Sequence, residues 1–199
     1  MHITIAGNLG SGKSTICGIL NKKHGFEVYS TGKIQRELAI KFGVSTLEMN
    51  IMMKTNPEYD HIIDDTVRDM SIERAEEKLI FDSRMAWHFA VKSFKIFVKV
   101  DPMVAAQRVM YSPRGEEETY ESVEDACEKL VERSKVENER FKDIYNVDNF
   151  DFNNYDLILD STFVPAEKIC EVIMKEYELF CANPDSYTTT YYDTAESYK

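Results

Sequence analysis

A glycine-rich stretch near the start of the chain has the residue types and spacing needed to bind phosphate. Residues 7–14 are Gly-Asn-Leu-Gly-Ser-Gly-Lys-Ser, which fits GxxxxGK[ST], and they lie between an apolar run and an amphipathic segment. Glycines let backbone N–H groups turn inward around phosphates, and the helix that follows directs its positive dipole end at them. Lys13 would reach the β- and γ-phosphates, and the Ser14 hydroxyl would ligate magnesium. We predict that ATP and Mg²⁺ bind through Gly7, Asn8, Leu9, Gly10, Ser11, Gly12, Lys13, Ser14 and Thr15.

The distribution of arginine suggests a second anion site. All eight arginines lie between positions 36 and 140, whereas the sixteen lysines are spread over the chain. Arginine suits bidentate recognition of phosphate, and transfer between two phosphates needs positive charge from several directions. A phosphate acceptor is already ionised near neutral pH and needs no general base, which fits a chain whose four histidines are scattered. The sequence therefore predicts an acceptor that carries phosphate.

Individual arginines have both functional and structural interpretations. Thr31, Gly32 and Arg36 open a helix after the second expected strand, where they form either a phosphate clamp or an N-cap with an exposed arginine. Asp82 and Arg84 end the third strand, where α/β sheets place their ligand crevice. There Asp82 would orient magnesium-bound water and Arg84 would face the acceptor phosphate, unless the two form an ordinary charge pair.

A third arginine group has helical spacing. Arg133, Glu137 and Arg140 are separated by four and three residues, so a helix displays them on one face. Such a face serves either as a closing lid that brings arginines onto phosphates or as a salt-bridge ladder in solvent. The local sequence alone favours the ladder.

The elements that position these residues follow from alternating short apolar and longer amphipathic runs, the pattern of a doubly wound α/β sheet with flanking helices. About 47 residues separate the second and third strands, which suggests an inserted helical lobe. The polar segment 112–121 is expected to be a mobile loop. We expect parallel strands at 2–6, 27–30, 78–82, 94–100 and 155–160, and helices at 13–23, 32–42, 46–54, 59–77, 102–110, 123–145 and 165–181.

Length and charge limit the organisation. The 199 residues suit a single domain at 1–182, with an acceptor lobe at about 32–77 and a lid region at about 112–140. We expect the tail, 183–199, to be loosely ordered or to pack on another subunit. A net charge of −11 argues against nucleic-acid and anionic-membrane partners. Without a signal-like or membrane-spanning segment we expect a cytoplasmic location, and the sequence leaves monomer and homo-oligomer open.

Several ordered motifs resemble the cytidylate kinase-like nucleoside monophosphate kinases, a family of P-loop kinases. The similarity runs from about residue 1 to about 180 and includes residues 7–14, 30–39, 56–60 with 63–64, 82–86, 95–100, 133–140 with 145–148, and 155–162. The resemblance implies phosphoryl transfer from ATP to CMP or dCMP. It implies catalytic roles for Lys13, Arg84, Arg133 and Arg140, acceptor binding by Thr31, Gly32, Arg36, Asp60, Arg84 and Glu137, and magnesium binding by Ser14 and Asp82.

The chain also departs from the family pattern. Ser83 replaces a glycine before the arginine, a glycine is missing before Trp87, and residues 111–120 form a longer, acidic lid insert. Two other functions therefore stay open. One is a kinase of another small metabolite, in which Asp60 or Asp64 would be the base for a hydroxyl acceptor, and the other is a non-catalytic nucleotide-binding regulator.

Overall fold

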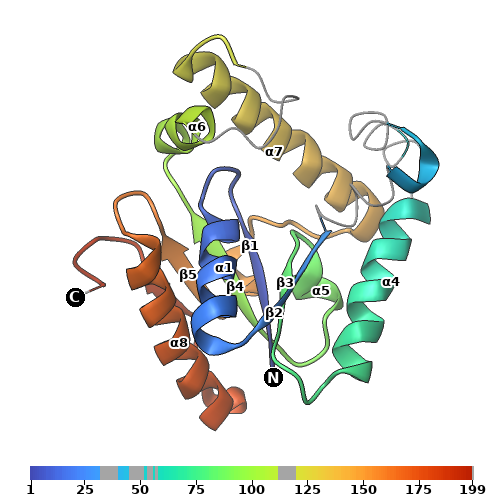
Figure 1. Ribbon diagram of the computed structural model, residues 1–199, viewed down its shortest axis with the longest axis vertical. Coiled ribbons are helices and arrows are strands. Elements are labelled where there is room, and N and C mark those ends of the chain that lie inside the picture. Colours follow the sequence, from blue (N-terminus) through green and yellow to red (C-terminus); the bar gives the residue numbers. More distant parts are fainter. Residues whose placement is uncertain (32–39, 45–51, 53–55, 57, 112–119, 199) are drawn as a thin grey trace.

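A parallel sheet runs through the centre of the protein (Figure 1). The computed structural model describes residues 1–31, 40–44, 52, 56, 58–111 and 120–198. In this part of the chain the sheet has six strands in the order β2-β3-β1-β4-β5-β6. The strands are β1 (His2–Gly7), β2 (Glu27–Ser30), β3 (Leu79–Asp82), β4 (Ser93–Lys99), β5 (Leu157–Asp160) and β6 (Thr190–Tyr192).

Both faces of the central strands are buried, which explains why β1 has no alternation of polar and apolar residues. Ile3 and Ile5 belong to the core cluster that also contains side chains of α1 (Lys13–His24) and α8 (Ala166–Ala182). Ala6 belongs to a second cluster around Trp87 of the short helix α5 (Ala86–Phe89). Because α1 follows β1 and α5 follows β3 on opposite faces, the carboxyl ends of these strands are the place where α/β sheets form their ligand crevice.

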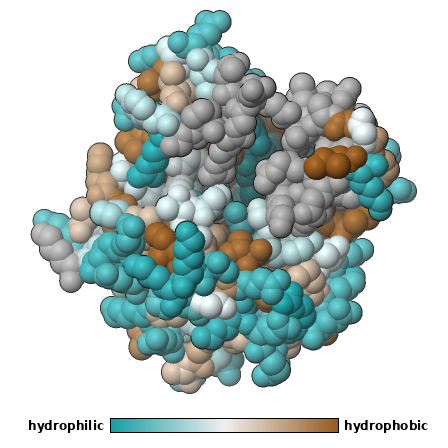
Figure 2. Space-filling model, in the orientation of Figure 1, coloured by the Kyte–Doolittle hydropathy of each residue, from teal (hydrophilic) through white to brown (hydrophobic). Residues whose placement is uncertain are grey.

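The remaining helices stand around this crevice. Helix α4 (Glu58–Glu73) lies at one side, and α6 (Pro102–Tyr111) and α7 (Val123–Tyr145) lie across the carboxyl ends of the strands (Figure 1). Short 3₁₀ turns occupy Phe152–Asn154 and Pro184–Ser186. Hydrophilic residues predominate over α1 and α8 on the face shown in Figure 2, as expected for helices with one buried side. No helix in the described ranges is long and apolar enough to cross a lipid bilayer.

Most predicted boundaries agree with the structure. The predicted range of α7 matches its observed bounds, because Ser122 caps one end by accepting a bond from the Asp125 N–H and Asn146 ends the other with a φ of 55°. Helix α4 was predicted to continue to residue 77 but ends at Glu73, and the short α5 was not predicted. The predicted helices at 32–42 and 46–54 and the loop at 112–121 fall largely outside the described residues.

The predicted number of strands is wrong, because the tail supplies a sixth. Strand β6 pairs in parallel with β5, with Leu157 opposite Thr190 and Leu159 opposite Tyr192. The tail is therefore ordered against its own chain through Tyr198, so the expectation of a loosely ordered tail is wrong. Its anchor on α8 is Glu176, 5% exposed, whose two carboxylate oxygens each accept a 2.8 Å bond, one from the Tyr187 hydroxyl and one from the Tyr192 hydroxyl.

We expect Glu176→Ala to lower the free energy of unfolding by about 3 kcal/mol, because two hydrogen bonds to a charged group are lost and the Tyr192 hydroxyl is left buried without its partner. Urea unfolding followed by circular dichroism measures the change, and limited proteolysis should release the tail. Glu178→Ala, on an exposed side of the same helix, is the control and should behave as wild type. Equal unfolding midpoints for the two variants would contradict this account of the tail.

Candidate active site

The glycine-rich loop joins β1 to α1 and is held tightly by its neighbours. Gly7 has a φ of +145°, and a Cβ there would lie 2.2 Å from the Val98 carbonyl oxygen of β4. Gly10 has a φ of +73°, and a Cβ there would lie 2.8 Å from the Ala105 Cβ of α6. Both positions need glycine for two reasons, the backbone conformation and the close packing. The Asn8 N–H also donates to the Val98 carbonyl over 3.1 Å, which ties the loop to β4.

The amino end of α1 is open to an anion. Its N-cap is Gly12, and no side chain caps the first turn. The N–H groups of Thr15 and Ile16 already donate to the Gly12 carbonyl, while the side chains of Ser14 and Thr15 are exposed. A helix end without a side-chain cap directs its positive dipole and its N–H donors outward, which is the arrangement that binds phosphate.

The ammonium group of Lys13 lies inside the curve of the loop. It donates to the Gly7 carbonyl over 2.9 Å and to the Asn8 carbonyl over 2.7 Å, and it lies 3.2 Å from the Ser11 hydroxyl. These contacts hold a positive charge at the centre of the loop. A terminal phosphate that enters the loop would meet this charge together with the backbone donors.

Asp82 is positioned beside the loop by the sheet. It ends β3 opposite Ile5 of β1 and opposite Ser30 of β2. The Ser30 hydroxyl lies 3.5 Å from its carboxylate, and the Thr31 hydroxyl donates to its backbone carbonyl over 3.4 Å. Burial is the main cause that raises the pKa of the Cys17 thiol in α1. The Asp82 carboxylate raises this pKa further and the Lys13 ammonium lowers it, because both charges lie near the first turn of α1. Carboxylate and hydroxyl oxygens such as those of Asp82 and Ser14 are ligands that fit Mg²⁺.

Arg84 connects the end of β3 with α7. Its guanidinium forms an ion pair with Glu137, and Glu137 also accepts a 3.1 Å bond from Arg133. Loss of hydration on burial, followed by repulsion from Arg133 and Arg140, lowers the pKa of Arg84 to about 9, while Asp82 opposes the shift. Arg84 therefore stays positively charged at neutral pH, in a place where several cations are crowded and an anion would be stabilised.

A small cavity adjoins this ion pair and is large enough for a single water molecule. Its lining includes Gly7 and Asn8 of the loop, Arg84 after β3, and Ser134 and Glu137 of α7. Arg84 and its partner Glu137 thus lie beside the phosphate loop. Arg140 belongs to the same charged group through its effect on Arg84, and its guanidinium lies 5.3 Å from the centre of the Phe141 ring.

Sequence reasoning missed Arg108 of α6. Its guanidinium donates to the Ser161 carbonyl over 2.6 Å and to the Thr162 carbonyl over 3.1 Å, and it lies 3.5 Å from the Gly10 carbonyl of the loop. The Ser161 hydroxyl lies 2.9 Å from the Ser11 carbonyl. Ser161 follows β5 at the same edge of the sheet as Asp82, so the rule for strand ends could have pointed to it.

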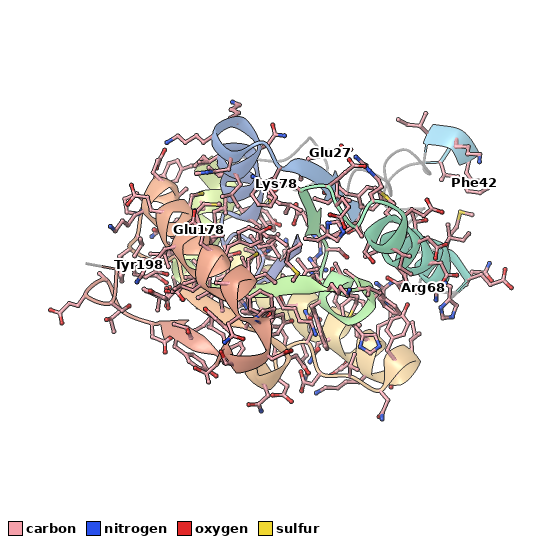
Figure 3. All side chains as sticks on the ribbon, turned by 90° about the horizontal axis from the view of Figure 1, so that it is seen from below. Glu27, Phe42, Arg68, Lys78, Glu178 and Tyr198 are labelled. Carbon is pink, nitrogen blue, oxygen red and sulfur yellow. The ribbon has the colours of Figure 1, made fainter. Side chains whose placement is uncertain are left out.

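Arg74 and Arg68, also in the predicted window, lie away from the site. Arg74 donates to both carboxylate oxygens of Glu27, at 3.1 and 2.6 Å, and Glu27 begins β2 at the opposite end of the sheet. Arg68 pairs with Asp65 and Asp69 and lies on the outer side of α4 (Figure 3). Arg36 and Arg114 lie outside the described residues, as does Gly32.

The predicted acceptor lobe contacts α7 through a buried carboxylate. Asp64 of α4 is 7% exposed and accepts a short hydrogen bond from the Tyr145 hydroxyl at the end of α7. The ring of His61 lies 6.0 Å from that of Tyr145, edge to face. Asp60 lies in the first turn of the same helix, and its side chain is outside the described part of the chain. Asp64 thus holds α4 against the helix that carries Arg133, Glu137 and Arg140.

Comparison with known proteins identifies relatives over most of the chain. The model of the "Cytidylate kinase-like family" matches residues 2–162. A cytidylate kinase from Thermoplasma volcanium is 31% identical over 182 residues, covering 89% of this chain and 92% of that protein. An S-adenosylmethionine-dependent nucleotide dehydratase from Lacinutrix mariniflava is 30% identical over 178 residues, which are 88% of this chain, and the chain spans only 36% of its length.

A solved structure agrees at the level of the fold. Shikimate kinase from Bacteroides thetaiotaomicron superposes with a TM-score of 0.63 over 89% of this chain and 98% of its own, at 11% identity. This likeness confirms the predicted α/β P-loop kinase fold. The family match extends over most of the chain, from the phosphate loop through the end of β5, and the chain therefore belongs to the cytidylate kinase-like family.

Proposed function

We propose that the protein transfers the γ-phosphoryl group of ATP to a nucleoside monophosphate, with CMP or dCMP as the acceptor. The observation that carries this proposal is the position of Arg84, which lines one small cavity together with Gly7 and Asn8 of the phosphate loop and is paired to α7 through Glu137. Fixed cations that face a phosphate loop suit a reaction in which both partners are phosphates.

The loop residues would bind the donor. Backbone N–H groups at the start of α1 would hold the phosphate chain of ATP, and the Lys13 ammonium would contact the phosphates nearest the acceptor. Ser14 and Asp82 would hold magnesium, directly or through water. When bound, magnesium neutralises negative charge on the transferred phosphate.

The arginines would stabilise charge between donor and acceptor. Glu137 contacts both Arg84 and Arg133, so two guanidiniums are placed before an acceptor arrives. A bound phosphate would relieve the repulsion among Arg84, Arg133 and Arg140, and this repulsion is one cause of the lowered pKa of Arg84. Thr31, Gly32, Arg36 and Asp60 stay in the proposal as acceptor contacts from the lobe side.

The choice of acceptor rests on the relatives. Both named relatives act on nucleotides according to their names, and one is a cytidylate kinase. No general base is needed for such an acceptor, and Asp64, which would be a candidate base for a hydroxyl acceptor, is buried against Tyr145. These observations favour a phosphate acceptor over a hydroxyl acceptor.

A panel of acceptors tests the function. The purified protein is given ATP and magnesium with CMP, dCMP, UMP, AMP, GMP or small hydroxyl acceptors, and ADP release is followed. We expect the highest kcat/KM with CMP or dCMP. Turnover restricted to a hydroxyl acceptor would show that the chain is a kinase of another metabolite. ATP binding without turnover on any acceptor would indicate the regulatory alternative.

Arg84→Ala should lower kcat/KM with the best acceptor on the order of 10²–10³-fold, because a fixed charge facing the transferred phosphoryl group is removed. Arg84→Lys should recover only part of the rate, since lysine cannot form the bidentate contact. Initial rates measure both effects. Arg68→Ala, which removes an exposed arginine of α4, is the matched control and should leave the rate unchanged. An unchanged rate in Arg84→Ala would remove Arg84 from the proposed site.

Asp82→Asn should raise the concentration of MgCl₂ needed for half-maximal rate about tenfold, because a neutral amide orients metal-bound water less well than a carboxylate. Initial rates at fixed ATP and increasing MgCl₂ measure the change. Asp65→Asn, on the exposed side of α4, serves as the control. If the magnesium curves of the two variants coincide, Asp82 has no part in holding the metal.

A further inference from the structure

The C-terminal strap, which we define as residues 187–198, lies along β5 and forms one edge of the sheet. Its strand β6 pairs with β5, and its last described residue, Tyr198, is 4% exposed. Figure 3 shows Tyr198 at the edge of the molecule on the side of α8. The strap lies beyond residue 162, where the match to the family model ends. It is therefore a feature that the family match does not explain.

Two contacts join the strap to the ends of β4 and β5. The Tyr198 hydroxyl donates to the backbone carbonyl of Asp160 over 3.0 Å. The Asp193 carboxylate accepts a 2.9 Å bond from the ammonium of Lys99. Asp160 and Lys99 are the last residues of β5 and β4, and the register pairs them with each other. The strap thus contacts the carboxyl ends of both β4 and β5.

The peptide group between Asp160 and Ser161 is hydrogen-bonded through both its carbonyl and its N–H, and Tyr198 forms the bond to the carbonyl. The Asp160 carbonyl and the Ser161 N–H belong to the same planar peptide unit. While Tyr198 donates to this carbonyl, the Ser161 N–H donates to the Lys99 carbonyl over 2.9 Å. With both ends bonded, the peptide plane cannot rotate without breaking a hydrogen bond, and the backbone that carries the Ser161 side chain is held in place.

Ser161 transmits this constraint to the phosphate loop. Its hydroxyl lies 2.9 Å from the Ser11 carbonyl and 2.9 Å from the Lys99 carbonyl, so its single proton has these two carbonyl oxygens as acceptors. Arg108 donates to the Ser161 carbonyl and also approaches the Gly10 carbonyl. Ser161 is 2% exposed and Ser11 is 1% exposed, so water does not compete for these bonds.

We propose that the strap positions the donor-nucleotide site: Tyr198 holds the Asp160–Ser161 peptide, and Ser161 in turn holds the phosphate loop at Ser11 in the shape that binds the phosphates of ATP. Tyr198 touches neither nucleotide and is a positioning residue. In the described part of the chain, Arg84 and Glu137 on the acceptor side form no hydrogen bond or ion pair with the strap, so the effect should be confined to the donor.

The test compares Tyr198→Phe with Tyr191→Phe. Tyr191 lies on the same strap, and its side chain is 47% exposed, so its hydroxyl is the matched control. Isothermal titration calorimetry gives the Kd of the magnesium complex of a non-hydrolysable ATP analogue, and steady-state kinetics give KM for ATP and for CMP. We expect Tyr198→Phe to raise the Kd and the KM for ATP about fivefold, the factor for one lost hydrogen bond, with KM for CMP unchanged.

A double variant separates positioning from general stability. If Tyr198 acts through Ser161, then Tyr198→Phe adds little to the weaker ATP binding of Ser161→Ala. Independent, additive losses of ATP affinity in the double variant would overturn the proposal. So would equal increases in KM for ATP and CMP, or a lower melting temperature with the ATP affinity unchanged, since both indicate a purely structural strap.

The kinetic part of this test rests on the proposed function, and the calorimetric part does not. Silence with every acceptor would refute the proposed phosphoryl transfer, yet the Kd values of the ATP analogue would still decide whether the strap positions the loop. A fivefold weaker Kd in Tyr198→Phe together with a silent acceptor panel would support the strap in a protein that binds ATP for another purpose.

Discussion

Mutual repulsion among guanidinium groups at the carboxyl ends of the strands is the constraint on which the site depends. The Arg84 side chain is partly buried and feels the charges of Arg133 and Arg140. Such an arrangement is stable only if an anion balances it, and Glu137 on α7 does so from between Arg84 and Arg133. The carboxylate therefore keeps the cations together near the phosphate loop, and a bound phosphate would complete the balance.

This balance requires that distant segments be held accurately in place. Arg84 comes from the end of β3, while its partner Glu137 comes from α7, whose far end is anchored by Tyr145 on Asp64 of α4. On the donor side the loop is held by β4 at Val98 and by the Ser161 hydroxyl after β5. The fold thus fixes backbone donors on one side of the crevice and side-chain cations on the other, and a phosphoryl group would pass between the two.

The sheet, the phosphate loop and α7 could be predicted from sequence because each leaves a local signal. Glycines at fixed spacing and apolar periodicity depend on the adjacent residues alone, and the bounds of α7 follow from its caps, Ser122 and Asn146. Strand β6 was missed because Thr190–Tyr192 is short and polar and becomes a strand only by pairing with the edge of β5. Its stability comes from residues far away in the sequence, such as Glu176 and Asp156.

The arginines show the same limit for the site. Arg74 and Arg84 are ten positions apart in the same arginine-rich window, but β3 lies between them and carries them to opposite ends of the sheet. Charge and residue type do not indicate at which end of a strand a side chain lies. Ligands bind at the carboxyl ends of the strands, so the residues that follow a strand are the candidates for the site. Applied to every strand, that rule selects Asp82 and Arg84 after β3 and also Ser161 after β5, through which Arg108 and the strap reach the loop. Position along the strands is therefore a better guide to this site than the clustering of arginine in the sequence.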